Sequence, residues 1–127
     1  MTEDDKNILF GDLFARIRHG VLVDGGSEYG VCTLVGFEYY VFLAETSYQL
    51  EVGLECPRPY LRPMSSMTEE EKLKLENMEF EIAHLKFTTY AHECMILDYL
   101  YSRHLDVRGL IPIGLALEAP EGMYKTE

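Results

Sequence analysis

The chain has 127 residues, with 11 basic and 22 acidic side chains and a formal net charge of −11. This length predicts one domain with its own hydrophobic core. The acidic balance argues against direct nucleic-acid binding, because neutralisation of phosphates by Lys and Arg supplies most of that affinity. It argues equally against binding to anionic membrane surfaces.

Apolar segments and cysteines indicate the compartment. No apolar run approaches the ~18 residues of a membrane-spanning helix, and the acidic first residues lack the basic and apolar regions of a secretory signal. Cys32, Cys56 and Cys94 are odd in number, widely spaced and set in apolar surroundings. This usage is typical of reduced, buried thiols, so we expect a cytoplasmic protein of the cell that makes it.

The first predicted element is a helix over residues 8–19. Leu9, Leu13 and Ile17 recur every four residues and form one apolar stripe. Gly20 follows the stripe, and glycine is the residue that most often ends a helix in a left-handed conformation. The spacing therefore predicts an N-terminal helix that lays this stripe against the core.

Four short strands are predicted next, over residues 21–23, 31–35, 37–44 and 48–55. Alternation of apolar and polar side chains is clearest over 48–55. Both faces of the 37–44 strand are apolar, so we expect it to be central and covered on both sides. The tight turns between the strands favour a small antiparallel β-meander or an SH3-like barrel.

Three prolines in residues 57–63 remove backbone donors and fix φ, so this segment is predicted to be an extended junction between two halves. Ser66 and Thr68 each precede a glutamate by three residues, which is the pattern of a capping box. A helix is therefore predicted from about 68 to 78. The residues that follow fit both helix and strand patterns, and we predict a strand over 80–88.

The last predicted elements are a helix over residues 91–104, a helical turn over 108–114 and a short closing strand over 115–118. The fold class is therefore α+β, with an N-terminal helix, a small sheet and a helical C-terminal half. We expect a single domain over residues 1–127. Its predicted parts are a sheet-rich half over about 1–57, a Pro-rich junction over 57–63 and a helix-rich half over 64–127.

No catalytic, cofactor-binding or metal-binding residue is predicted. His92, Cys94 and His104 come nearest to a metal set, but residues 92 and 94 of a helix point about 200° apart and cannot chelate one ion. Cys32 and Cys94 lack the local signature of a catalytic nucleophile. An enzyme that uses a cysteine or a pair of carboxylates stays open as an alternative.

Two segments are more particular than packing requires. One is Tyr-Leu-Arg-Pro-Met-Ser-Ser-Met-Thr-Glu-Glu-Glu at residues 60–71. The other runs over residues 105–110 and on to Glu-Ala-Pro-Glu-Gly-Met-Tyr at 118–124. In both, the chain resembles a family of small uncharacterised proteins of gut Bacteroidales and their prophages and mobile elements. The resemblance implies a shared fold and a phage or mobile-element setting, and it implies no reaction.

Five residues of these segments are the candidate site: Tyr60, Leu61, Arg62, Asp106 and Arg108. Tyr60 and Leu61 are expected to insert between the two halves while the prolines hold the entry angle. Arg62 or Arg108 is expected to pair with Asp106 or with a helix C-terminus. The alternative is that these residues form a docking surface for a partner.

The lack of a catalytic motif, the acidity and the nine tyrosines favour a non-enzymatic accessory or interaction protein of phage or mobile-element type. Its expected partner is a protein, either a second copy or another chain, and no cofactor is expected. One alternative is an acidic nucleic-acid mimic that binds a basic host protein. A second alternative is a small enzyme with a Cys or carboxylate site.

Overall fold

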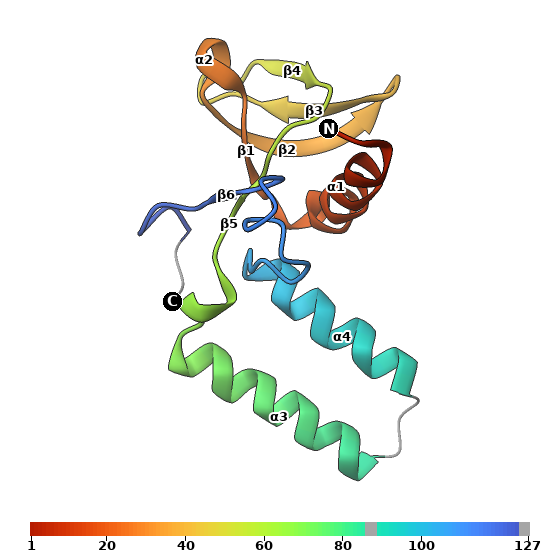
Figure 1. Ribbon diagram of the computed structural model, residues 1–127. Coiled ribbons are helices and arrows are strands. Elements are labelled where there is room, and N and C mark those ends of the chain that lie inside the picture. Colours follow the sequence, from red (N-terminus) through yellow and green to blue (C-terminus); the bar gives the residue numbers. More distant parts are fainter. Residues whose placement is uncertain (86–88, 125–127) are drawn as a thin grey trace.

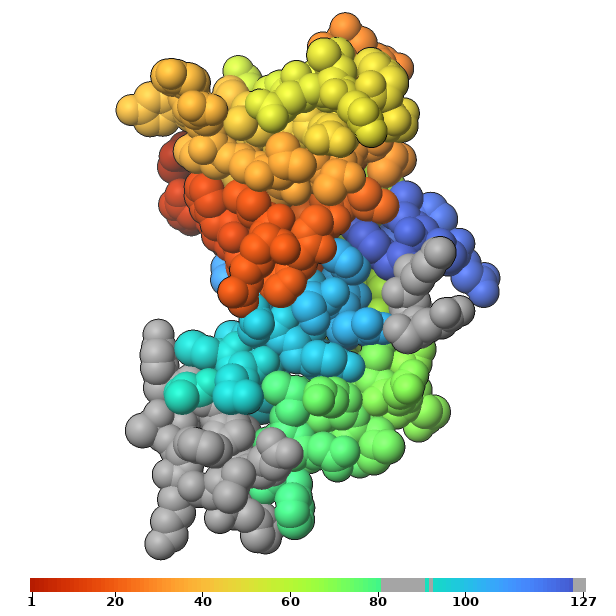
Figure 2. Space-filling view, turned by 180° about the vertical axis from the view of Figure 1, so that it is seen from behind, coloured from red at the N-terminus to blue at the C-terminus, as the bar shows by residue number. Residues whose placement is uncertain are grey.

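The computed structural model describes the backbone of residues 1–85 and 89–124, and the side chains of these residues except 81–85, 89, 90 and 92. Figure 1 shows an antiparallel sheet at one end, a hairpin of two long helices at the other, and extended chain between them. Figure 2 shows the same two ends from behind, with the C-terminal segment at the waist between them. The α+β class predicted from the sequence is confirmed.

Helix α1 (Glu3–Arg16) begins earlier than the predicted range of 8–19 because Thr2 caps it. The Thr2 hydroxyl accepts a hydrogen bond from the Asp5 amide at 3.0 Å, and the Asp5 carboxylate accepts one from the Thr2 amide at 3.3 Å. A 3-10 turn, η1 (Ile17–His19), continues the helix to Gly20, whose φ is 66°. Gly20 is therefore confirmed as the terminating residue.

The sheet is an antiparallel meander in the order β1 (Leu22–Asp24), β2 (Val31–Glu38), β3 (Val41–Glu45) and β4 (Glu51–Leu54). β1 and β4 lie at opposite edges of this sheet. The predicted meander is therefore confirmed, and the predicted alternative of an SH3-like barrel is wrong. A short helix, α2 (Gly26–Tyr29), connects β1 to β2.

The predicted strand over residues 37–44 is wrong, because the chain reverses in the middle of it. β2 continues through Gly36, with a β-bulge between Leu34 and Gly36, and ends at Glu38. Tyr39 and Tyr40 then form the connection to β3, with φ values of 53° and 67°. Two-residue hairpin turns of type I′ require positive φ at both positions and usually take Asn and Gly. No turn residue marked this reversal in the sequence.

The core lies between α1 and the sheet. Leu9 and Leu13 of α1 are fully buried in one cluster with Leu34 and Phe42 of the sheet. The ring of Phe14 lies 5.3 Å from that of Phe42, and further Phe contacts extend this aromatic cluster toward the hairpin. The stripe predicted on the first helix is therefore the face that α1 buries.

The C-terminal half begins with β5 (Tyr60–Leu61), the turn η2 (Met64–Ser66) and helix α3 (Glu69–Leu85). Helix α4 (Thr89–Ser102) follows, and β6 (Leu117–Glu118) pairs in parallel with β5. The strand predicted over 80–88 is wrong for residues 80–85, which continue α3, and residues 86–88 lie outside the described part. None of the described helices is long and apolar enough to cross a membrane.

A buried ion pair connects α1 to the C-terminal half. Asp12 and Arg16 lie one helical turn apart, with Arg16 Nε donating to Asp12 Oδ2 at 2.7 Å, and both side chains are fully buried. Arg16 Nη2 also donates to the carbonyl oxygen of Leu105 at 2.7 Å, and the guanidinium lies 4.7 Å from the centre of the Tyr101 ring. Because both charges are paired and hydrogen-bonded, they are tolerated inside the protein.

Candidate functional site

The two segments singled out in the sequence lie side by side in the structure, joined by main-chain hydrogen bonds. The amide of Leu117 donates to the carbonyl of Pro59 at 2.9 Å, and the amide of Ala119 donates to that of Leu61 at 2.8 Å. The main chain of Arg62 instead bonds to the segment after α4. Its amide donates to the carbonyl of His104, and its carbonyl accepts from the amide of Asp106, each at 2.8 Å. The segment around β5 is therefore held by two separate parts of the C-terminal half.

Leu61 and Tyr60 differ in how deeply they enter this junction. Leu61 is fully buried in the core cluster, whereas Tyr60 is half-buried. The carbonyl of Tyr60 accepts a hydrogen bond from the hydroxyl of Tyr124 at 2.8 Å, and the same hydroxyl accepts from the amide of Leu22 at 2.8 Å. Tyr124 thus ties the last described residues to both β5 and β1.

His104 covers the other side of Tyr124. The two rings are stacked, with 3.9 Å between their centres. Burial, followed by the positive charge of Arg16, lowers the pKa of His104 to about 4, and burial raises the pKa of Tyr124 to about 12. Both rings are therefore neutral at pH 7 and pack as a neutral pair.

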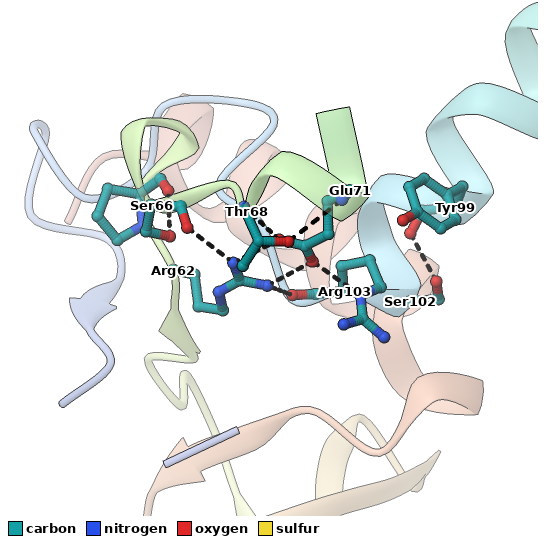
Figure 3. A network of polar contacts seen from close by, with 8 residues as sticks. Arg62, Ser66, Thr68, Glu71, Tyr99, Ser102 and Arg103 are labelled. Atoms are coloured by element: carbon teal, nitrogen blue, oxygen red, sulfur yellow. Dashed lines mark hydrogen bonds and ion pairs between the residues drawn. The ribbon is translucent and has the colours of Figure 1, made fainter. Parts of the chain in front are cut away.

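Arg62 forms the centre of a polar network that fixes the start of α3 (Figure 3). Its Nη2 donates to Glu71 Oε1 at 2.7 Å and its Nη1 donates to Glu71 Oε2 at 2.8 Å, a bidentate pair. Arg103 Nε, from the turn after α4, donates to the same Oε2 at 2.8 Å. The network therefore holds together the junction, the start of α3 and the end of α4.

Glu71 also completes the capping box predicted at Thr68. The Thr68 hydroxyl accepts from the Glu71 amide at 3.1 Å, and the Thr68 amide donates to Glu71 Oε1 at 2.9 Å. Burial by itself would raise the pKa of Glu71, but the hydrogen bonds from Arg62, Arg103 and Thr68 outweigh it. They hold the pKa of this carboxyl well below its usual range.

The expectation that Arg62 or Arg108 pairs with Asp106 is wrong. The Asp106 carboxylate instead accepts from the amides of Leu110 at 2.7 Å and Ile111 at 3.0 Å, so that it caps the turn after it. Arg108 Nε donates to the hydroxyl of Tyr101 at 3.0 Å. The other part of that expectation is confirmed, because Arg62 Nη1 also donates to the carbonyl of Arg103, just beyond the last residue of α4, at 3.1 Å.

A groove of about 520 Å³ opens where the two segments meet. One wall comes from the end of β5, the turn η2 and the cap of α3, and the other comes from β6 and the residues after it. The lining residues are Arg62, Pro63, Ser66, Thr68, Glu118, Ala119, Pro120, Glu121, Gly122 and Tyr124. Of the five candidate site residues, Arg62 is the one that lines this groove.

A second candidate surface, which the sequence did not indicate, is the hairpin tip between β2 and β3. Tyr39 is 87% exposed and Tyr40 is 91% exposed, and both have positive φ. Phe37 lies just before the tip and packs against Phe42, with 4.8 Å between the ring centres. The tip therefore presents two tyrosines from an aromatic base that belongs to the core.

The cysteines do not all lie where the sequence predicts. All three are free; Cys32 is buried and Cys56 half-buried, whereas Cys94 is exposed on α4. The predicted burial of Cys94 is therefore wrong. The side chain of His92 lies outside the described part, and no group of three His, Cys, Asp or Glu side chains within the described part could hold a metal ion.

Histidine and cysteine do not combine into a nucleophile pair among the described contacts. Cys94 lines an apolar groove between α1 and α4, together with Asp98. His19 Nε2 lies 3.2 Å from Asp98 Oδ1, and the Cys94 thiol forms no hydrogen bond within the described part. A catalytic thiol needs a base within hydrogen-bond reach, and the described contacts place no such base beside the Cys94 thiol.

Comparison of the chain with family models, curated proteins and solved structures gives no match.

Proposed function

We propose that the chain is a non-enzymatic interaction protein that binds a partner protein in the cytoplasm of the producing cell, with the Tyr39–Tyr40 tip as its contact point. The observation that carries the proposal is the combination of exposure and strain at this tip. Its phage or mobile-element setting rests on the sequence resemblance described above.

The backbone strain at Tyr39 and Tyr40 is informative because the exposed side chains make too little buried contact to offset it. A left-handed conformation costs an L-residue about 1–2 kcal/mol, and the side chains of Tyr39 and Tyr40 are almost wholly in solvent. Asn-Gly would form the same turn without that cost. Strained positions that the fold does not require often mark functional sites.

The chemistry of the tip suits protein recognition. Tyrosine offers a large apolar ring and a polar tip at modest entropic cost, and it is enriched among residues that dominate binding energy. The aromatic cluster of Phe14, Phe37 and Phe42 supports the hairpin from below. A rigid base reduces the conformational entropy lost on binding.

The acidic-mimic alternative has less support. Exposed carboxylates lie at the start of α1, on β3 and β4, on α3 and at the groove. A nucleic-acid mimic needs its negative charge gathered on one face, as phosphates are along a duplex. The distribution instead fits a general role of the charge in solubility.

The test is capture of partners with the tagged full chain from a nuclease-treated Bacteroidales host lysate, at low and high salt. The decisive variant is Tyr39→Asn/Tyr40→Gly, which removes both rings and keeps a favourable turn. Tyr48→Asn is the matched control, because Tyr48 is 63% exposed on another loop.

We expect one stoichiometric protein to be captured by the wild type and by Tyr48→Asn, and to be lost with the double variant. Equal capture by all three proteins would show that the tip is not the contact point. If no protein is captured at either salt concentration, the proposed function is wrong. Loss of the partner at high salt alone would favour the acidic mimic.

A further inference from the structure

The groove between the segments 60–71 and 118–124 has walls that are each fixed by hydrogen bonds. One wall is fixed by the Arg62–Glu71 pair and the capping box at Thr68. The other is fixed by the β5–β6 bonds and by the hydroxyl of Tyr124. A preorganised groove loses little entropy when a ligand enters it.

The volume of the groove limits the size of its ligand. About 520 Å³ is typical of sites that take a small molecule or a few residues of a peptide. The groove lies beside the extended chain of β5 and β6 rather than in a closed cavity, as its lining residues from both segments show. This form suits a short extended segment.

The charged side chains that line the groove indicate which charge a bound segment would carry. Glu118 and Glu121 are exposed in the lining, and neither is paired with a cation in the described part of the chain. Arg62 also lines the groove, but both of its terminal nitrogens are directed to Glu71 and to main-chain carbonyls. The groove therefore offers two unpaired carboxylates and one cation that is already engaged.

The hydrogen-bonding character of the lining points the same way. Pro63 and Pro120 have no amide hydrogen to donate, and their carbonyls already accept from the amides of Ser66 at 2.9 Å and Met123 at 3.0 Å. The Ser66 hydroxyl is already directed to the carbonyl of Pro63, at 2.7 Å. The carboxylates of Glu118 and Glu121 are the acceptors that the lining leaves exposed to a ligand, and Lys and Arg side chains are the protein groups richest in donors.

We propose that this groove binds an extended, Lys- or Arg-bearing segment of a partner protein. This inference rests on one part of the proposed function, namely that the chain binds a partner protein. The groove is a different surface from the Tyr39–Tyr40 tip, so each can fail without the other.

The test is titration of the full chain into a fluorescein-labelled peptide of four Arg-Ala repeats, followed by fluorescence anisotropy at near-physiological ionic strength. Peptides of four Glu-Ala and four Ser-Ala repeats are the probe controls. Glu118→Gln/Glu121→Gln is the groove variant. Glu51→Gln/Glu55→Gln is its matched control, because it removes the same charge from exposed positions on and beside β4.

We expect saturable binding of the arginine peptide alone, weakened about tenfold by the groove variant and little changed by the β4 variant. Amide shifts in ¹⁵N-labelled protein should concentrate on residues 62–68 and 118–124. Equal weakening by both variants would show diffuse attraction to an acidic protein and would overturn the proposal, as would the absence of saturable binding.

The Tyr39→Asn/Tyr40→Gly variant separates this proposal from the proposed function. It should bind the arginine peptide as tightly as the wild type, because the tip does not line the groove. If the wild type captures no protein from lysate but binds the arginine peptide, the tip proposal is refuted and the groove proposal stands. If the wild type captures a partner that the tip variant loses, and the wild type does not bind the peptide, the groove proposal is refuted and the tip proposal stands.

Discussion

Replacing Glu71 with glutamine tests whether the buried network holds the junction to the start of α3 and the end of α4. Glu71 is 2% exposed, and its carboxylate accepts four hydrogen bonds, from Nη1 and Nη2 of Arg62, from Nε of Arg103 and from the amide of Thr68. Glutamine keeps the shape of the side chain. It removes the negative charge and turns one acceptor oxygen into a donor group that faces other donors.

The expected loss of unfolding free energy is about 3–5 kcal/mol, the range for breaking a buried ion pair so that its cationic partners are left uncompensated. The loss should fall toward the lower end of that range, because the side chain of Arg103 is 24% exposed and water can solvate it. Against a total stability of about 5–15 kcal/mol for a domain, this change is large.

The assay is urea unfolding followed by circular dichroism, with Glu69→Gln as the matched control. Glu69 is two residues away on α3 and pairs with Lys72, but its side chain is 93% exposed. Exposed pairs contribute about 0–1 kcal/mol, so the control should unfold close to the wild-type midpoint. A loss below about 1 kcal/mol for Glu71→Gln would refute the reasoning that the network is a main support of the junction.

The same variant has a pH signature. The pKa of Glu71 is held below its ordinary value of 4.5 in the folded protein, so its stabilisation is present above that value. It is lost as the pH falls toward the lower, folded pKa. The gap in stability between the wild type and Glu71→Gln should therefore be full at pH 7 and narrow below pH 4.5. A gap that does not depend on pH would contradict the charge argument.

Two further predictions concern stability. Tyr39→Asn/Tyr40→Gly should raise the unfolding free energy by about 1–2 kcal/mol, since it relieves left-handed strain at exposed positions; an unchanged or lower urea midpoint would remove the strain argument. His104 has φ of 61° and a pKa lowered from 6.5 to about 4 in the fold, so the wild type should lose stability as the pH falls from 6.5 toward 4. His104→Asn, which tolerates the same φ, should lose less over that interval, although the lowered pKa of His19 leaves part of the effect. Equal losses would show that His104 is not the responsible group.

Elements with a local cause were predictable from the sequence. Gly20 ends the first helix because it takes the left-handed conformation there, and Thr68 caps α3 because Glu71 stands three residues later. Both signals act over a few residues of chain. The meander follows similarly from short apolar strands separated by turn residues.

The errors have equally specific causes. Residues 80–85 fit helix and strand patterns alike, and continuation from a well-capped helix decides for α3. The reversal at Tyr39–Tyr40 carries no glycine or asparagine, so a turn looked like the middle of an apolar strand. Capping by Thr2 extended α1 over polar residues that carry no apolar periodicity.

The contacts of the candidate site were harder to predict from the sequence than the fold. Leu61 and Arg62 were singled out by their segment, but the partner of Arg62 depended on which carboxylate the fold brought to it. Asp106 lay in the other segment and appeared the natural partner, whereas its side chain is occupied by the amides of the turn that follows.

The sequence by itself determined the acidity, the class of fold, the end of the first helix at Gly20 and the cap of α3 at Thr68, because each depends on composition or on neighbours within one turn of chain. Only the tertiary structure decided that Glu71 meets Arg62 and Arg103, that two distant segments line one groove, and that two tyrosines stand at a strained tip. These features depend on contacts between residues far apart in the chain, or on a turn that the surrounding strands impose. Local propensity encodes neither.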